Sequence, residues 1–169
     1  MAKAARAFRN LTAPQMQAWR AYAAAQNRTD KLTGRTYAPA ANSIFAGLAA
    51  KLLQIDPQAE LPTAPPSSPF RSDSIRVTAQ PAAGGITFIP SAPNSEGILT
   101  ELILQPLKSI HRTPNPRSYR TMAFTSFAEG QPVTIPTRLT PYAPAYRFVD
   151  SATGQSSGLI PLPVITGID

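Results

Sequence analysis

The sequence contains no cysteine and only one histidine. The absence of thiols excludes disulfide bonds, thiolate metal sites and cysteine nucleophiles. Long apolar runs are also missing, and a membrane-spanning helix needs about 20 mostly apolar residues. We therefore expect neither a membrane segment nor a metal centre built from cysteine and histidine.

Acidic residues are scarce as well, with nine Asp and Glu against 16 Lys and Arg. The closest acidic pair in the C-terminal half is Glu96 and Glu101, on either side of Gly97, whereas glycosidase chemistry needs two carboxylates held at a fixed separation. No calcium-loop pattern and no Gly-x-Ser-x-Gly elbow occurs. The sequence predicts a protein that is not an enzyme and has no catalytic residue, cofactor or metal.

The single histidine, His111, lies between Ile110 and Arg112 in a stretch that predicts the end of a strand and a loop. A zinc site needs several ligands together, and a catalytic histidine needs a nucleophile and a carboxylate beside it. We expect His111 to be a surface or loop residue.

The positive charge is concentrated near the N-terminus. Residues 1–60 hold eight basic and three acidic residues, a formal charge of +5, and the remaining 109 residues hold eight and six, a charge of +2. Such an excess indicates either solubility alone or a partner with a negative surface.

Proline is abundant, with 19 residues in the chain. Because proline disrupts helix interiors and central strands, this content disfavours a helical bundle and a long parallel sheet. We predict an α+β chain of short elements in four parts: a basic arm at 1–11, a helical hairpin at 12–56, a proline-rich linker at 57–73 and a β-sandwich at 74–169.

The first predicted helix begins at Thr12, whose spacing to Gln15 fits a capping box. Trp19 lies on its apolar face and is predicted to anchor a core. Residues 27–38 are polar and predict a loop that turns at Gly34. A second helix, at about 39–54, has an apolar stripe that includes Phe45 as a core anchor.

The second helix carries almost no charge, so we expect it either to be buried on several sides or to bind a partner. The predicted contact residues come from the arm and from this helix: Lys3, Arg6, Arg9, Ile44, Leu48 and Leu52. Five prolines in the following linker favour an extended connector, which could reach about 50 Å at about 3.1 Å per residue.

The C-terminal part alternates short β-rich runs with turn signals. Seven such runs favour an antiparallel sandwich, and the prolines of the last run, from Leu159 to Ile165, are typical of an edge strand. The candidate strands are SIRVTA, GITFIP, ILTELILQP, YRTMAFTSF, PVTIPT, AYRFVD and GLIPLPVI.

The segment from Leu139-Thr140-Pro141 through Tyr146 to Gly154 resembles the end of a fibronectin type III domain. The resemblance implies an immunoglobulin-like sandwich in which the Tyr146 hydroxyl bonds to a nearby backbone group. Phe88 stands in for the usual early tryptophan, and Phe148 would be a further anchor.

The whole chain also resembles a family of phage and prophage-encoded proteins. The matching residues are Leu11, Thr12, Gln15, Trp19, Tyr22, Ala23, Gly34, Asn42 and Phe45. This resemblance implies a virion structural protein, such as a capsid decoration or cement protein or a head–tail or tail accessory protein. Its expected partners are the major capsid or the tail or connector proteins, with many identical copies assembled into the virion in the host cytoplasm.

Two other functions remain open. The basic N-terminal half is compatible with a nucleic-acid-binding or packaging-associated protein, which we favour less because the charges form no obvious stripe. Tyr119 between Arg117 and Arg120 is the only hint of an RNA-binding face. A carbohydrate-binding surface module would use exposed aromatic residues, for which Tyr142 and Tyr146 are the candidates.

Overall fold

The computed structural model describes residues 2–30 and 32–166. It is an α+β chain with antiparallel sheets, as predicted, and it divides into two compact units. The helical unit comprises the chain up to Pro69 together with Ser151–Gln155. The two-sheet unit comprises Phe70–Asp150 and the residues from Ser156 onward.

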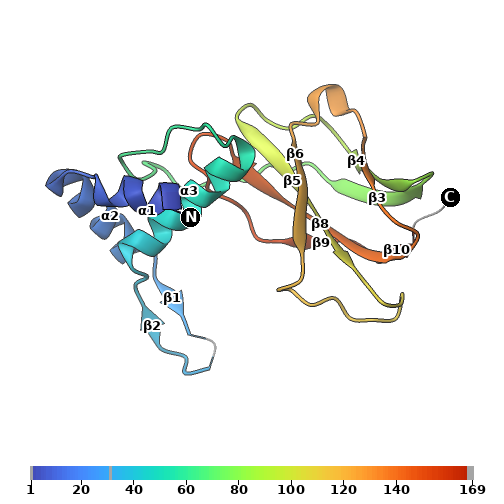
Figure 1. Cartoon of the computed structure of the whole chain (residues 1–169), viewed down its shortest axis with the longest axis horizontal. Coiled ribbons are helices and arrows are strands. Elements are labelled where there is room, and N and C mark those ends of the chain that lie inside the picture. The colour runs from blue at the N-terminus through green and yellow to red at the C-terminus, as the bar shows by residue number, and fades with distance from the viewer. Residues whose placement is uncertain (1, 31, 167–169) are drawn as a thin grey trace. The chain divides into compact units, whose positions relative to one another are not determined.

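The helical unit contains three helices and a short antiparallel strand pair (Figure 1). Both predicted helices form, as α2 (Ala13–Ala25) and α3 (Ala41–Ile55). The predicted arm is instead helix α1 (Ala2–Arg9). The predicted loop contains strands β1 (Arg28–Thr29) and β2 (Thr36–Tyr37).

Helix α2 begins with the predicted capping box. The Thr12 backbone N–H donates to Gln15 Oε1 at 2.9 Å, and the Gln15 N–H donates to Thr12 Oγ1 at 3.5 Å. Pro14 occupies the first turn, where a missing N–H leaves no hydrogen bond unmade. These local contacts fix the start of the helix.

Trp19 is the centre of the helical core, as predicted, with 0% of its surface exposed. Its ring meets Phe45 of α3 edge-on, with centroids 5.1 Å apart, and its Nε1 donates to the Thr63 carbonyl at 3.2 Å. Phe8 of α1 also packs against Phe45, and the centroids of the two rings are 5.3 Å apart. Helix α1 is therefore held by apolar packing and is not a free arm.

The proline-rich residues that follow α3 do not form the predicted free connector. Lys3 Nζ donates to the carbonyls of Pro57 and Ala59, at 3.1 and 3.2 Å. Leu61 packs against the helical core, and Trp19 Nε1 donates a hydrogen bond to the Thr63 carbonyl. This segment therefore covers the helices as part of their own unit.

The two-sheet unit contains every predicted strand. One sheet has the order β3-β4-β7 and the other β10-β8-β5-β6, with β9 also paired to β8 (Figure 1). The strands are β3 (Val77–Ala82), β4 (Gly85–Pro90), β5 (Ile98–Pro106), β6 (Arg120–Thr125), β7 (Val133–Pro136), β8 (Pro141–Asp150), β9 (Ile160–Pro161) and β10 (Ile165–Thr166). A 3-10 turn, Ala128–Gly130, precedes β7.

The last predicted strand is an edge strand, and it is split in two. Both β9 and β10 pair with β8, and Pro161 ends β9 while Pro163 lies where the pairing is interrupted. Because a proline has no N–H to donate, a continuous ladder cannot form through this segment.

The two sheets share one apolar core, which contains the predicted anchors Phe88, Tyr146 and Phe148. Tyr146 and Phe148 meet edge-on with centroids 5.5 Å apart. The Tyr146 hydroxyl accepts a hydrogen bond from the Val77 N–H at 3.5 Å. The hydroxyl therefore bonds to a backbone group, as the fibronectin resemblance implied, and that group belongs to a strand of the opposite sheet.

Asp73 links the segment that precedes β3 to the loop between β4 and β5 through hydrogen bonds. Its carboxylate accepts from the Ser95 N–H at 2.9 Å, from Asn94 Nδ2 at 3.0 Å and from the Ser74 N–H at 2.9 Å. Partial burial raises the pKa of the Asp73 carboxyl, but the hydrogen bonds from Ser95, Asn94 and Ser74 outweigh burial and hold the pKa below its usual value.

The turn after β8 belongs to the helical unit. Gln155 Nε2 donates to the Tyr22 hydroxyl at 3.2 Å and to the Ser68 carbonyl at 3.4 Å. Gly154 has a φ of +73°, and a Cβ at this position would collide with the Leu48 carbonyl. Only glycine fits this close approach to α3.

We predict that Trp19→Ala lowers the free energy of unfolding of the helical unit by about 3–5 kcal/mol, because truncation of a buried tryptophan leaves a cavity. Chemical denaturation followed by circular dichroism measures this loss. Leu32→Ala is the control, since Leu32 is 97% exposed. Equal stability of the two variants would contradict the central place of Trp19 in the core.

We predict that Asp73→Asn destabilises the two-sheet unit by about 1–2 kcal/mol at pH 7, where the charged hydrogen bonds are partly screened by water. The folded pKa of Asp73 is lowered, so its stabilisation is complete above the unfolded pKa of about 3.9 and disappears as pH falls through the folded value.

Denaturation of wild type and variant between pH 7 and pH 2 tests this dependence. The difference in the free energy of unfolding between wild type and Asp73→Asn should become smaller below about pH 4. The exposed Glu96, changed to Gln, serves as the control with little effect at any pH. If the difference in the free energy of unfolding between wild type and variant stayed constant across the acid range, the charge of Asp73 would not be what stabilises this loop.

Candidate interaction surfaces

The β1–β2 hairpin extends away from the three helices of its unit (Figure 1). Arg28 pairs with Tyr37, and Thr29 pairs with Thr36. Asp30 organises the turn, because its Oδ1 accepts from the N–H groups of Leu32 and Thr33, each at 2.8 Å. Hydrogen bonds from Thr33 and Leu32 hold the pKa of the Asp30 carboxyl below its usual value.

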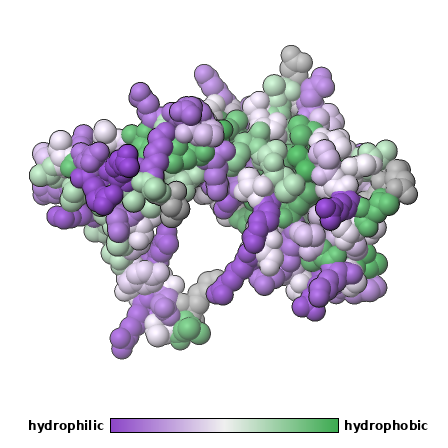
Figure 2. Space-filling view, in the orientation of Figure 1, coloured by the Kyte–Doolittle hydropathy of each residue, from purple (hydrophilic) through white to green (hydrophobic). Residues whose placement is uncertain are grey.

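Little of the hairpin is buried by the chain itself. Apart from the half-buried Asp30, the described residues between Asn27 and Ala38 are exposed. Leu32 is 97% exposed near the turn, and Tyr37 is 49% exposed. Figure 2 shows hydrophilic side chains along this segment and a small hydrophobic patch toward its end.

The hairpin also carries positive charge. Arg28 and Arg35 flank the turn on β1 and beside β2, and both are exposed. Asp30 is already occupied by backbone N–H groups. The hairpin therefore carries an exposed apolar side chain near its turn and two exposed arginines, on a short two-stranded ribbon that is marginal in isolation.

The contact residues predicted on the arm have different environments. Arg6 and Arg9 are exposed on α1. Lys3 is exposed too, but its ammonium group is bonded to the carbonyls of Pro57 and Ala59. Arg6 and Arg9 can face a partner, whereas Lys3 stabilises the unit to which it belongs.

The contact residues predicted on α3 are largely covered. Ile44 is 9% exposed and Leu52 is 4% exposed, while Leu48 is half-buried beside the core. Gly154 of the turn after β8 lies against Leu48 and Leu52. A partner surface made from Ile44 and Leu52 would need them exposed, and the fold instead uses them as its own interior.

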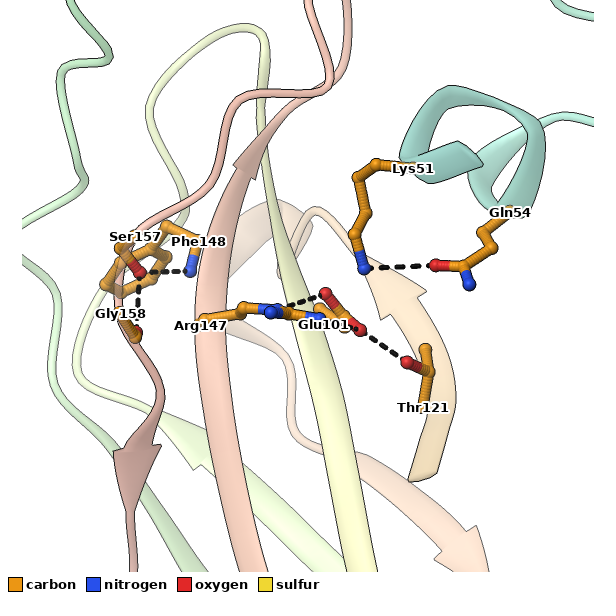
Figure 3. A network of polar contacts seen from close by, with 8 residues as sticks. All are labelled: Lys51, Gln54, Glu101, Thr121, Arg147, Phe148, Ser157 and Gly158. Atoms are coloured by element: carbon orange, nitrogen blue, oxygen red, sulfur yellow. Dashed lines mark hydrogen bonds and ion pairs between the residues drawn. The ribbon is translucent and has the colours of Figure 1, made fainter. Parts of the chain in front are cut away.

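A partly buried ion pair that the sequence did not reveal lies in the two-sheet unit. Glu101 on β5 is 0% exposed, and its carboxylate accepts from Arg147 Nε at 2.6 Å and Arg147 Nη2 at 3.0 Å. Thr121 on β6 donates a short hydrogen bond to the same carboxylate. Figure 3 shows these three side chains converging from three neighbouring strands.

This network is suited to holding strands in register. Glu101 lies directly opposite Arg147 in the β5–β8 ladder, so the bidentate contact follows from the pairing. Glu96, by contrast, is exposed in the preceding turn. The fold therefore gives the two carboxylates different environments, one in water and one bound by a guanidinium group.

The remaining candidates from the sequence are loop or core residues. His111 is exposed in the β5–β6 connection, as predicted. Arg120 Nη1 donates to the carbonyls of Arg117 and Tyr119, so it shapes its own loop. Tyr119 is half-buried, and burial raises the pKa of its hydroxyl.

The tyrosines considered for carbohydrate binding are poorly placed. Tyr146 is 5% exposed and belongs to the core. Tyr142 is half-buried, and its hydroxyl accepts from the Arg138 N–H at 3.4 Å. Tyr146 offers no ring face on which a sugar could stack.

Within residues 2–30 and 32–166, no group of three or more His, Asp or Glu side chains is arranged to hold a metal ion. None of the described helices combines the length and the apolar character needed to cross a membrane. Comparison of the chain with protein-family models, with curated proteins and with solved structures found no match.

Proposed function

We propose that this chain is a non-catalytic structural protein of a phage virion, which attaches to a neighbouring virion protein through the exposed surface of its helical unit. The observation that carries the proposal is the β1–β2 hairpin, which buries little within the chain yet presents Leu32 between Arg28 and Arg35. Tyr37 of the same ribbon is 49% exposed, and apolar side chains grouped on a surface and rimmed by polar residues support a protein contact.

We further propose that the two-sheet unit is an immunoglobulin or fibronectin type III-like sandwich. Its first, second and fifth strands pair in one sheet, and the remaining strands pair in the other. Such exchange of consecutive strands between two sheets supports a Greek-key sandwich. In the helical unit, α2 and α3 would then be the proposed helical hairpin, extended by α1.

The charge of the helical unit indicates the chemistry of its partner. The unit holds eight basic and three acidic residues, a formal charge of +5, and Arg6, Arg9 and Arg28 are exposed. The proposed partner is a virion protein with an apolar pocket for Leu32 and acidic residues around it. Opposite charges would guide docking, and the buried leucine would supply affinity.

The residues behind the resemblance to phage proteins support the same assignment. Thr12 and Gln15 form the helix cap, Trp19 and Phe45 form the core, and Gly34 adopts a φ of +67° beside the hairpin turn. These residues therefore cap and pack the helices to which the hairpin is joined, and Gly34 allows its turn. Many copies of the chain would bind equivalent sites, as the symmetry of a virion requires.

We predict that Leu32→Asp lowers incorporation of the chain into virions by about tenfold or more, because it removes the apolar contact and adds a charge that acidic partner residues repel. The amount of chain per purified particle is measured by quantitative mass spectrometry. Thermal melting should be unchanged, since the side chain is exposed.

Leu139→Asp is the matched control, because Leu139 is a 61% exposed leucine of the two-sheet unit. Its incorporation should equal that of the wild type. Equal incorporation of both variants would remove the hairpin as the attachment point. Absence of the wild-type chain from every particle preparation would contradict the virion assignment itself.

Nucleic-acid binding is the second candidate, and the +5 charge of the helical unit is the observation that favours it. Arg9 and Arg28 are exposed, as phosphate contacts require. Arg20 has a local partner, since its Nη2 lies 3.6 Å from Met16 Sδ.

We predict that the chain shows no measurable binding to duplex DNA at about 150 mM salt, because scattered arginines neutralise few phosphates. Fluorescence anisotropy across a salt titration checks this. Tight binding that weakens steeply and linearly with the logarithm of salt concentration would favour the nucleic-acid function over the structural one.

A further inference from the structure

The connection between β5 and β6, residues 107–119, borders a cavity of about 260 Å³ in the two-sheet unit. Pro106 and Leu107 line part of its wall, and the other lining residues are polar or basic. They are Gln105, Lys108, Arg112, Thr113, Asn115 and Ser118. The lining contains no carboxylate.

The cavity is held in shape by hydrogen bonds of the connection itself. Gln105 Oε1 accepts from the Asn115 N–H at 3.0 Å, which ties the loop to the end of β5. The Asn115 carbonyl accepts from the Ser118 N–H at 2.9 Å. At the other side, Thr140 Oγ1 donates to the Leu107 carbonyl at 3.1 Å. A site preformed in this way loses little conformational entropy when a ligand binds.

The two cations of the lining, Lys108 and Arg112, are exposed. Across the part of the chain that the structure describes, the side chains of Lys108 and Arg112 make no hydrogen bond or ion pair. The neighbouring arginines differ, because Arg120 caps backbone carbonyls and Arg147 binds Glu101. Two positive groups on one cavity, without a counter-charge of their own, favour an anion.

The neutral groups of the wall add further donors. The hydroxyls of Thr113 and Ser118 have no partner among residues 2–30 and 32–166. Gln105 is 7% exposed, and its Oε1 is occupied by Asn115. Its Nε2 therefore remains as a donor on the wall of the cavity. The wall combines two charges, two hydroxyls and an amide that can all donate.

We propose that this cavity binds a single phosphate or sulfate group, either free or carried by a small molecule. A tetrahedral oxyanion has several acceptor oxygens and no strong need for acceptors in the site, which matches a wall rich in donors. The volume is below the range of about 300–1,000 Å³ typical of drug-sized ligands, so the substituent is small. The cavity belongs to the two-sheet unit and the hairpin to the helical unit, so this proposal does not rest on the proposed attachment.

The test is an NMR titration of the full chain with inorganic phosphate at constant ionic strength, with chloride as the replaced anion. Amide signals of residues 107–118 should shift and saturate. In a Lys108→Ala/Arg112→Ala variant the affinity should fall by about tenfold or more, because charge-assisted hydrogen bonds are lost.

Arg117→Ala is the matched control, since Arg117 belongs to the same connection but does not line the cavity. It should bind phosphate within about twofold of the wild type. If the double Ala variant does not fold, Lys108→Gln/Arg112→Gln replaces it. Equal binding by wild type and double variant, or shifts without saturation spread over the whole surface, would overturn the proposal.

A parallel titration with a sugar phosphate and with inorganic sulfate identifies the source of the anion. Tighter binding of the sugar phosphate than of inorganic phosphate would support the site and assign it to a small phosphorylated ligand. Equal binding of all three would support it as a site for the free anion. Binding of none of the three would reject the proposal.

Discussion

The burial of Trp19 is the interaction on which the helical unit depends. Its ring fills the space between α2 and α3, and its N–H holds the Thr63 carbonyl, so one side chain fixes two helices and the proline-rich segment. A unit of this size buries a small fraction of its surface and has little stability to spare. The described residues of the β1–β2 hairpin form no core of their own. The position of the hairpin therefore depends on the helices that Trp19 holds together.

The two-sheet unit relies on polar contacts as well as on its apolar core. Glu101 and Arg147 lie opposite each other in neighbouring strands, and a slip of the register would leave a buried carboxylate without its partner. Because desolvation offsets much of the attraction in such a pair, its main contribution here is to specify the pairing. Asp73 specifies the entry into β3 in the same way, through the N–H groups of Ser74 and Ser95.

Local sequence signals predicted the elements well, and long-range contacts could not be predicted from them. The Thr12–Gln15 cap spans three residues and could be read directly, whereas Glu101 meets Arg147 across 46 positions. Helix α1 was missed because its buried face consists of small alanines and Phe8, a weak apolar pattern. The contacts of Lys3 and Thr63 use backbone carbonyls, which leave no trace in the sequence. The cavity beside Lys108 and Arg112 could not be predicted either, because it depends on the conformation of the β5–β6 connection.

The β1–β2 hairpin is exposed in the free chain, and the proposed function requires that it becomes buried when the chain joins its assembly. Hydrogen exchange of the backbone amides of residues 28–30 and 32–37, compared between the free chain and purified virions, tests it most directly. The account predicts rapid exchange in the free chain and strong protection in the virion. Equal exchange of these amides in both states, with protection gained elsewhere in the chain, would contradict it.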